Sequence, residues 1–300
     1  MLRTIPDYCD TNTLLIPQSL FSMSDAHLIM AHQEAAIFYK CIQQDMTGIE
    51  FFTSTPCLAF VLSGTETFTS FDDQQFTLEQ HEMLFMPKNI FLISDFVRTN
   101  GPLVAFLFFF DQDTIEFFLK ATTNRPETSA QELLPYKVTK NKNITSYMNA
   151  LNNVYRNING TPDLLRTKLL ELLFLIDTKD ENDNLISFLT NAKENNAKRS
   201  ISHLMREYRC HNLSVQDFAE LTGRSLSSFN RDFKRQFGTT PHQWLIDARL
   251  DRAMKLIQST QMNVTEIALE VGYDNVSHFI KAFKTKYGQT PKQARSKIFC

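Results

Sequence analysis

Residues 213–241 read LSVQDFAELTGRSLSSFNRDFKRQFGTTP and residues 262–291 read MNVTEIALEVGYDNVSHFIKAFKTKYGQTP, a repeat that decides the fold of the last third of the chain. The second copy has one extra residue after its first glycine. The aligned pairs are Ala219 with Ala268, Gly223 with Gly272, Phe229 with Phe279, Phe233 with Phe283, Gly238 with Gly288, and Pro241 with Pro291. Such self-similarity indicates one structural unit used twice.

Each copy predicts a helix, a tight turn and a second helix. Ser214 with Asp217, and Asn263 with Glu266, have the spacing of capping boxes that begin a helix. Gly223, like its partner in the second copy, supplies the positive φ that a sharp turn requires. Two helix-turn-helix units are therefore expected, at about residues 214–237 and 263–287.

The second helix of each unit has two phenylalanines at i and i+4 as its inward face, which leaves a polar and basic outward face. Arginine can donate to two acceptors on a guanine edge, and basic side chains near the helix ends reach phosphates. Arg231 and Lys281 are the leading predicted base readers. The predicted phosphate contacts are Lys234, Arg235, His278 and Lys284. Ile280 could touch a thymine methyl or pack inside the unit.

A continuous helix is predicted between the units, from Pro241 to Gln258. Its length of roughly 27 Å approaches the ~34 Å that separates successive major-groove faces on one side of B-DNA. One chain could therefore place two recognition helices in adjacent turns of the groove.

At these residues the sequence resembles the AraC/XylS family of bacterial regulators, over about Lys198 to Lys297. The motifs that carry the resemblance are Ala219 with Gly223, FKRQFGTTP at 233–241, Ala248-Arg249-Leu250 with Ala253, Ile267-Ala268, Val271-Gly272-Tyr273, Ser277-His278-Phe279, Phe283-Lys284 and YGQTP at 287–291. The resemblance implies transcription control, usually activation through contact with RNA polymerase. It places the DNA-facing positions at Ser227, Asn230, Arg231, Ser277, Ile280 and Lys281.

The N-terminal part predicts a sheet followed by helices. From Ile49 to Phe110, short apolar runs alternate with turn-forming residues, which is typical of an antiparallel barrel or sandwich. Helical spacing follows from Asn143 to Ile176, with an apolar stripe that could be core or a subunit seam. We expect that stripe, Leu165, Leu169 and Leu172, to pair two subunits of a homodimer.

This part resembles, more weakly, the cupin-like sensory and dimerisation domain of virulence and type III secretion activators. The expected fold class is α+β: a cupin-like β-barrel with a helical pair, then an all-α domain of two helix-turn-helix units joined by a long helix. The expected domains are 1–190 and 201–297, with a polar linker at 191–200.

Charge separates the two parts. Residues 193–300 carry 18 Lys+Arg against 10 Asp+Glu, a net charge of +8, whereas the preceding 192 residues carry a net charge of −10. A positive field attracts a polyanion such as double-stranded promoter DNA, although a basic solvated face without a partner has the same composition.

Other classes of protein find no support in the sequence. The first residues lack a signal-peptide pattern and no long apolar run occurs, so we expect a cytoplasmic protein without membrane contact. The five cysteines are scattered, without metal-ligand spacing, and are expected to be reduced thiols; no metal or cofactor is expected. Common phosphate-binding and nucleophile motifs are absent, so no enzyme is predicted.

Two classes of effector are compatible with the sequence. The phenylalanine-rich barrel could bind an apolar guest, or a protein antagonist could bind the N-terminal domain. The alternative function is a ligand- or protein-binding sensor module whose DNA binding is secondary.

Overall fold

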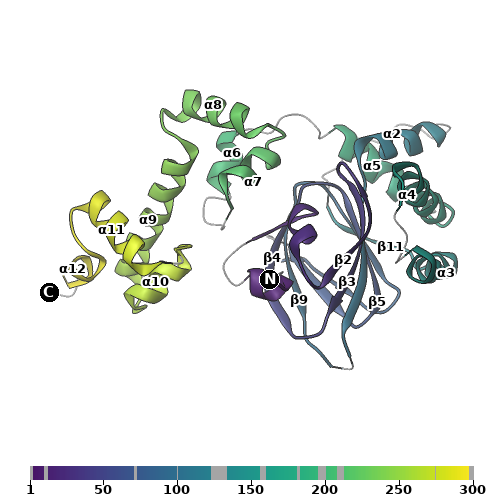
Figure 1. Cartoon of the computed structure of the whole chain (residues 1–300), viewed down its shortest axis with the longest axis horizontal. Coiled ribbons are helices and arrows are strands. Elements are labelled where there is room, and N and C mark those ends of the chain that lie inside the picture. Colours follow the sequence, from purple (N-terminus) through teal and green to yellow (C-terminus); the bar gives the residue numbers. More distant parts are fainter. Residues whose placement is uncertain are drawn as a thin grey trace. The chain divides into compact units, whose positions relative to one another are not determined.

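The computed structural model describes residues 3–9, 13–70, 73–99, 101–122, 134–155, 160–180, 183–194, 201–207, 213–273 and 275–296. Contacts divide the chain into an N-terminal unit that contains Leu14–Ala197 and a C-terminal unit that contains Lys198–Cys300 (Figure 1). All described strands longer than a single residue lie in the first unit, and the described elements of the second are helices. The predicted α+β class is confirmed.

Two open sheets form the N-terminal unit. The first has the order β1 (Leu14–Ile16), β4 (Met46–Thr53), β9 (Phe91–Phe96), β6 (Glu66–Ser70) and β7 (Gln75–Leu78). The second has the order β11 (Tyr136–Val138), β8 (Met83–Met86), β5 (Cys57–Ser63), β10 (Leu103–Phe109), β3 (Ala35–Ile42) and β2 (Ala26–His32). β1 pairs with β4 in parallel, and the other neighbours are antiparallel.

Of the two arrangements that the sequence leaves open, a barrel or a sandwich, the structure has two separate sheets, since no hydrogen-bonded ladder joins them within the described residues. Their edges explain the separation. β1 and β11 have three residues each and β7 has four, so three of the four edge strands offer few backbone groups to another strand.

Strand β10 shows where the core lies. It reads LVAFLFF and is buried along its whole length. Leu107 and Phe109 belong to the core between the two sheets, whereas Phe106 and Phe108 belong to the core between the second sheet and the helices. Because a strand presents successive side chains to opposite faces, a sheet covered on both faces produces a continuous apolar run.

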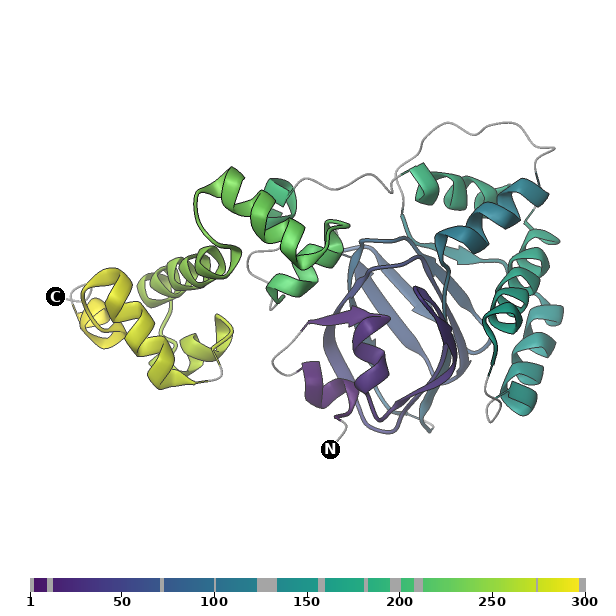
Figure 2. The ribbon, with the colours of Figure 1, turned by 45° about the horizontal axis from the view of Figure 1, so that its top comes forward.

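Four helices pack against the second sheet (Figure 2). They are α2 (Gln112–Ala121), α3 (Lys142–Ala150), α4 (Pro162–Asp177) and α5 (Asn184–Glu194). α4 begins as the sequence predicts: Thr161 is the N-cap, its side chain accepts a hydrogen bond from the Leu164 N–H at 3.2 Å, and Pro162 occupies the first turn.

The leucine stripe of α4 belongs to the core of this same unit. Leu165 is 2% exposed, and Leu169 and Leu172 are fully buried among side chains of the second sheet and the neighbouring helices. These side chains have no surface to offer a second subunit. The predicted dimer seam at Leu165, Leu169 and Leu172 is therefore wrong, because the sheet beneath α4 already covers the stripe.

The C-terminal unit consists of short helices around one long helix. They are α6 (Ile201–Glu207), α7 (Val215–Leu221), α8 (Leu226–Phe237), α9 (Pro241–Ser259), α10 (Val264–Glu270), α11 (Val276–Tyr287) and α12 (Pro291–Ser296). α9 contacts both α8 and α11. Upstream, α5 continues to Glu194, so the segment expected as a linker at 191–200 is helical over its first four residues. Its remainder lies outside the described residues.

Candidate nucleic-acid interface

Both capping boxes are present. In the first helix-turn-helix unit, the Ser214 side chain accepts a hydrogen bond from the Asp217 N–H at 3.1 Å, and the Asp217 carboxylate accepts one from the Ser214 N–H at 2.7 Å. In the second, the corresponding bonds between Asn263 and Glu266 measure 2.9 and 2.6 Å. They fix the starts of α7 and α10, the first helix of each unit.

The turns and the helix ends also repeat. Gly223 has φ +65° and Gly272 has φ +81°, which lets the chain reverse after α7 and after α10. α8 and α11 each end at a left-handed glycine, Gly238 and Gly288, both with φ +70°. The two units therefore share one local geometry, as their sequences predict.

The inward faces of α8 and α11 are the phenylalanine pairs. Phe229, Phe233, Phe279 and Phe283 are all fully buried. The ring centroids lie 5.8 Å apart in the first pair and 5.7 Å apart in the second. Burial of these rings fixes which face of each helix points to solvent.

That solvent face carries the predicted contacts. The predicted contact residues that are exposed are Ser227, Asn230, Arg231, Lys234, Arg235, Ser277, His278, Lys281 and Lys284. Ile280 differs, because it is half-buried and packs against the core of the second unit. Packing therefore accounts for part of its surface, which leaves less of it for a base.

An acidic residue within the first basic face was not identified from the sequence. Asp232 on α8 is 22% exposed and lies between three arginines. The Asp232 carboxylate is 3.4 Å from Arg224, 3.7 Å from Arg231 and 3.3 Å from Arg235. Arg231 nevertheless remains 74% exposed. A carboxylate among arginines restrains their guanidinium groups and offsets part of their charge. The nearest sequence signal was the aspartate beside Arg231 in a basic helix.

A second polar cluster ties α11 to the long helix α9. The Lys286 ammonium lies 2.7 Å from the Asp251 carboxylate and donates to the Asp247 carbonyl at 2.7 Å. The Tyr287 hydroxyl donates to Asp251 at 2.6 Å. Burial alone would raise the pKa of the Asp251 carboxyl, but these bonds from Lys286 and Tyr287 outweigh it and hold that pKa below its ordinary value. This cluster sets the position of the second basic helix along α9.

Metal-binding groups and membrane-spanning helices are both absent from the part of the chain that the structure describes. Within the described residues, no group of three or more His, Cys, Asp or Glu could hold a metal ion. No described helix combines the length and the apolar character needed to cross a bilayer. Of the cysteines expected to be reduced thiols, Cys210 and Cys300 lie outside the described residues.

Comparison with protein families gives two matches. Residues 56–188 match the ExsA N-terminal regulatory domain, and residues 218–297 match a helix-turn-helix domain. A regulatory domain followed by a helix-turn-helix domain defines the class of the protein. Both matches agree with the resemblance to AraC/XylS regulators that the sequence shows.

Relatives of known name are regulators rather than enzymes, the class that the sequence predicts. The HTH-type transcriptional regulator ExsA of Pseudomonas aeruginosa is 26% identical over 134 residues, which cover 45% of this chain and 48% of ExsA. The virulence regulon transcriptional activator VirF of Yersinia enterocolitica is 26% identical over 132 residues, which cover 44% of this chain and 48% of VirF. The match thus spans about half the length of these curated relatives. Among solved structures, ToxT of Vibrio cholerae aligns with a TM-score of 0.36 and 13% identity over 89% of this chain and 98% of ToxT.

Proposed function

We propose that the chain is a sequence-specific DNA-binding transcription activator that inserts α8 and α11 into successive turns of the major groove. The observation that carries the proposal is the repeated amphipathic helix: each one buries a phenylalanine pair and exposes a basic face. An α-helix fits the major groove, and cationic side chains supply the phosphate contacts.

The length of α9 supports the spacing. α9 has 19 residues and contacts both α8 and α11. At 1.5 Å per residue it is about 28 Å long, close to the ~34 Å between equivalent groove positions on one face of the duplex. Two recognition helices that both contact α9 could therefore reach sites about one helical turn apart.

The exposed residues divide by chemistry. Arg231 and Lys281, near the middle of their helices, are proposed to read base edges. The other proposed base readers are Ser227, Asn230, Ser277 and Ile280. The proposed phosphate contacts are Lys234, Arg235, His278 and Lys284, which carry no direct sequence information.

The finer parts of the function rest on the N-terminal unit and the relatives. VirF is named as a transcriptional activator, which supports activation over repression. We propose that activation occurs through contact with RNA polymerase. The match to a regulatory domain supports control of DNA binding by a small molecule or a protein antagonist. The proposed location of the chain is the cytoplasm. We also propose that the chain acts as a homodimer, with a seam other than the buried leucines of α4; sedimentation across a concentration series tests this.

The second candidate function is a sensor module whose DNA binding is secondary. It is favoured by a cavity between the two sheets of the N-terminal unit, lined by ten apolar and three polar side chains. If sensing dominates, the purified chain binds DNA measurably only after a ligand is added or an antagonist is removed.

DNA binding is tested with a duplex selected from a random-sequence pool by the purified full-length chain. Its affinity, measured at several salt concentrations, should fall steeply as salt rises, because protein binding releases cations from the phosphates and a higher salt concentration opposes that release. Lys234→Ala should weaken specific and random duplexes alike and reduce the salt slope by about one. Lys142→Ala, an exposed lysine of the N-terminal unit, serves as the control and should change neither. Failure to enrich any duplex, or equal effects of both variants, contradicts the proposal.

A further inference from the structure

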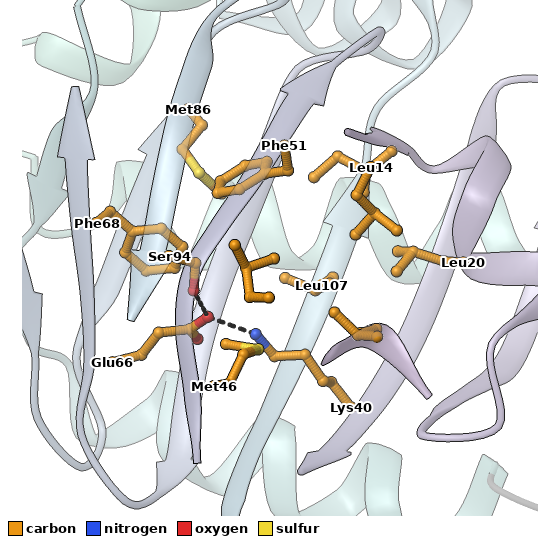
Figure 3. Close-up of a pocket in the computed structure, with 13 residues that line it drawn as sticks. Leu14, Leu20, Lys40, Met46, Phe51, Glu66, Phe68, Met86, Ser94 and Leu107 are labelled. Carbon is orange, nitrogen blue, oxygen red and sulfur yellow. Dashed lines mark hydrogen bonds and ion pairs between the residues drawn. The ribbon is translucent and has the colours of Figure 1, made fainter. Parts of the chain in front are cut away.

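A small cavity lies between the two sheets of the N-terminal unit (Figure 3). Its apolar lining comes from strands of both sheets, from α1 (Ile5–Cys9) and from the short helix η1 (Gln18–Ser22). Met46, Phe51 and Met86 are part of this lining. Only three of the lining side chains, Lys40, Glu66 and Ser94, are polar.

The three polar side chains meet at one oxygen. The Lys40 ammonium and the Ser94 hydroxyl both bind Glu66 Oε1, at 2.5 and 2.6 Å. The side chain of Glu66 is fully buried and that of Lys40 is 7% exposed. The second carboxylate oxygen, Glu66 Oε2, is buried and has no hydrogen-bond partner among the described residues.

This arrangement leaves both an acceptor and donors available in the cavity wall. A carboxylate oxygen can accept two hydrogen bonds, and a lysine ammonium carries three N–H groups. Among the described residues, the hydrogen bond found for the Lys40 ammonium is the one to Glu66. A buried acceptor without a partner is costly, so a ligand group that satisfies Glu66 Oε2 binds favourably.

Charge selects the class of ligand. The charges of Lys40 and Glu66 offset each other, so the polar end of the cavity is close to neutral. A carboxylate placed there would face the Glu66 carboxylate, and an ammonium would face Lys40. A hydroxyl avoids both penalties, because it donates to one residue and accepts from the other.

We propose that this cavity binds a small neutral molecule with an apolar body and one hydroxyl group. The hydroxyl donates to Glu66 Oε2 and accepts from Lys40, and the apolar body lies among the aliphatic and aromatic side chains. The cavity volume of about 30 Å³ holds a group the size of a hydroxyl. The apolar body is larger than this volume, so its binding requires a shift of Met46 and Met86, whose unbranched side chains repack easily. The proposal concerns the N-terminal unit alone and does not rest on DNA binding.

The test uses the full-length chain labelled with ¹³C at its methionine methyl groups and titrated with 1-hexanol, hexanoate or hexylammonium. Met46→Leu and Met86→Leu assign the two methyl signals at the cavity. 1-Hexanol should shift these two signals saturably, and each charged ligand should bind about tenfold more weakly or worse. No saturable shift at Met46 and Met86, or equal affinity for hexanoate, overturns the proposal.

Two variants separate recognition by the polar pair from simple filling of an apolar space. The double variant Lys40→Met with Glu66→Leu replaces a buried ion pair by apolar side chains, a change that is often neutral or stabilising for a fold. It should weaken 1-hexanol binding by about tenfold. Ser94→Ala leaves Glu66 Oε2 in place and should keep 1-hexanol binding within about twofold, since it removes no group that the ligand contacts. Unchanged hexanol binding in the double variant, when its dispersion of methyl signals shows a folded chain, rejects the role of Lys40 and Glu66.

Discussion

At the scale of single residues, Asp232 distinguishes the two proposed recognition helices. Asp232 lies among three arginines in α8, whereas the aligned position in α11 is Ala282. A carboxylate therefore restrains the first basic face, whereas no ion pair is found for Lys281 or Lys284 among the described residues. This asymmetry predicts different tolerance to substitution in the two helices.

Asp232→Asn should raise affinity for random duplex and lower the ratio of specific to random binding. Removing the carboxylate adds one net positive charge and frees Arg231 and Arg235 to bind phosphates without a fixed register. The measurement is titration of both duplexes at one salt concentration. Asp163→Asn makes the same charge change at an exposed position of α4 and should leave the ratio of specific to random binding unaltered. If Asp232→Asn also left that ratio at the wild-type value, the role given to Asp232 would be contradicted.

Gly238 offers a test of backbone conformation alone. Its φ is +70°, and a Cβ added there meets no atom within 4 Å. Gly238→Ala should therefore lower the free energy of unfolding of the C-terminal unit by about 1–2 kcal/mol, from backbone strain without a clash. Urea denaturation measures this, with the exposed Gln236→Ala as control. A change under about 0.5 kcal/mol, the usual range for a surface substitution, would mean that the turn relaxes at little cost.

At the scale of elements, α4 is a core helix. Leu169→Ala should lower the free energy of unfolding of the N-terminal unit by about 2–5 kcal/mol, because it opens a cavity beneath a fully buried side chain. Chemical denaturation gives the loss, and sedimentation of the folded variant gives its association. If Leu169→Ala dissociated a dimer without lowering the free energy of unfolding, the original prediction of a dimer contact at Leu165, Leu169 and Leu172 would be supported instead.

The contact between α9 and α11 predicts a dependence on pH. The pKa of Asp251 is lowered in the folded chain, so its bonds add stability above the ordinary carboxyl pKa and lose that contribution as pH falls through the lower, folded value. Tyr287→Phe should cost about 1 kcal/mol or less at neutral pH, since Asp251 is largely exposed, and the difference should shrink in acid.

The control for that prediction is Tyr273→Phe. The Tyr273 hydroxyl is buried and has no hydrogen-bond partner among the described residues. Removing it should therefore be neutral or stabilising at every pH. Equal losses in both variants would mean that ring packing, rather than the bond to Asp251, holds α11 against α9.

Local signals explain what the sequence could predict. Capping boxes, turn glycines and phenylalanine pairs act within a few residues, so α7, α8, α10 and α11 follow from the chain itself. β5, β6, β8 and β10 lie in the stretch from Ile49 to Phe110, where the alternation of apolar runs and turn-forming residues predicts strands for the same reason. β2 and β3 lie before the stretch in which the sequence predicts strands. Neither shows a regular alternation: β3 is buried along almost its whole length, and β2 buries and exposes its side chains irregularly.

Contacts between distant residues explain what was missed. Lys40 and Glu66 are 26 residues apart in the sequence, and only the packing of the two sheets against each other brings their side chains together. The leucines of α4 look the same in sequence whether a sheet or a second subunit covers them. The approach of three arginines to Asp232 depends on the directions of side chains in α8 and in the turn before it. Each of these features requires the three-dimensional arrangement.

At the scale of the whole molecule, the central claim is that one chain reads two groove faces about one helical turn apart. The C-terminal unit carries the basic excess, and α9 links the two recognition helices. Binding by a single unit would produce one short protected site, whereas binding by both units predicts two separable ones.

Hydroxyl-radical footprinting and titration of the wild-type chain, Arg231→Ala and Lys281→Ala, on the selected duplex and on duplexes with single base-pair changes, test this claim most directly. Each variant should bind about 1–3 kcal/mol more weakly and should relax base preference at its own position, with the two positions about 10 base pairs apart. Loss of preference at the same position in both variants, or unchanged protection in either, would contradict the account.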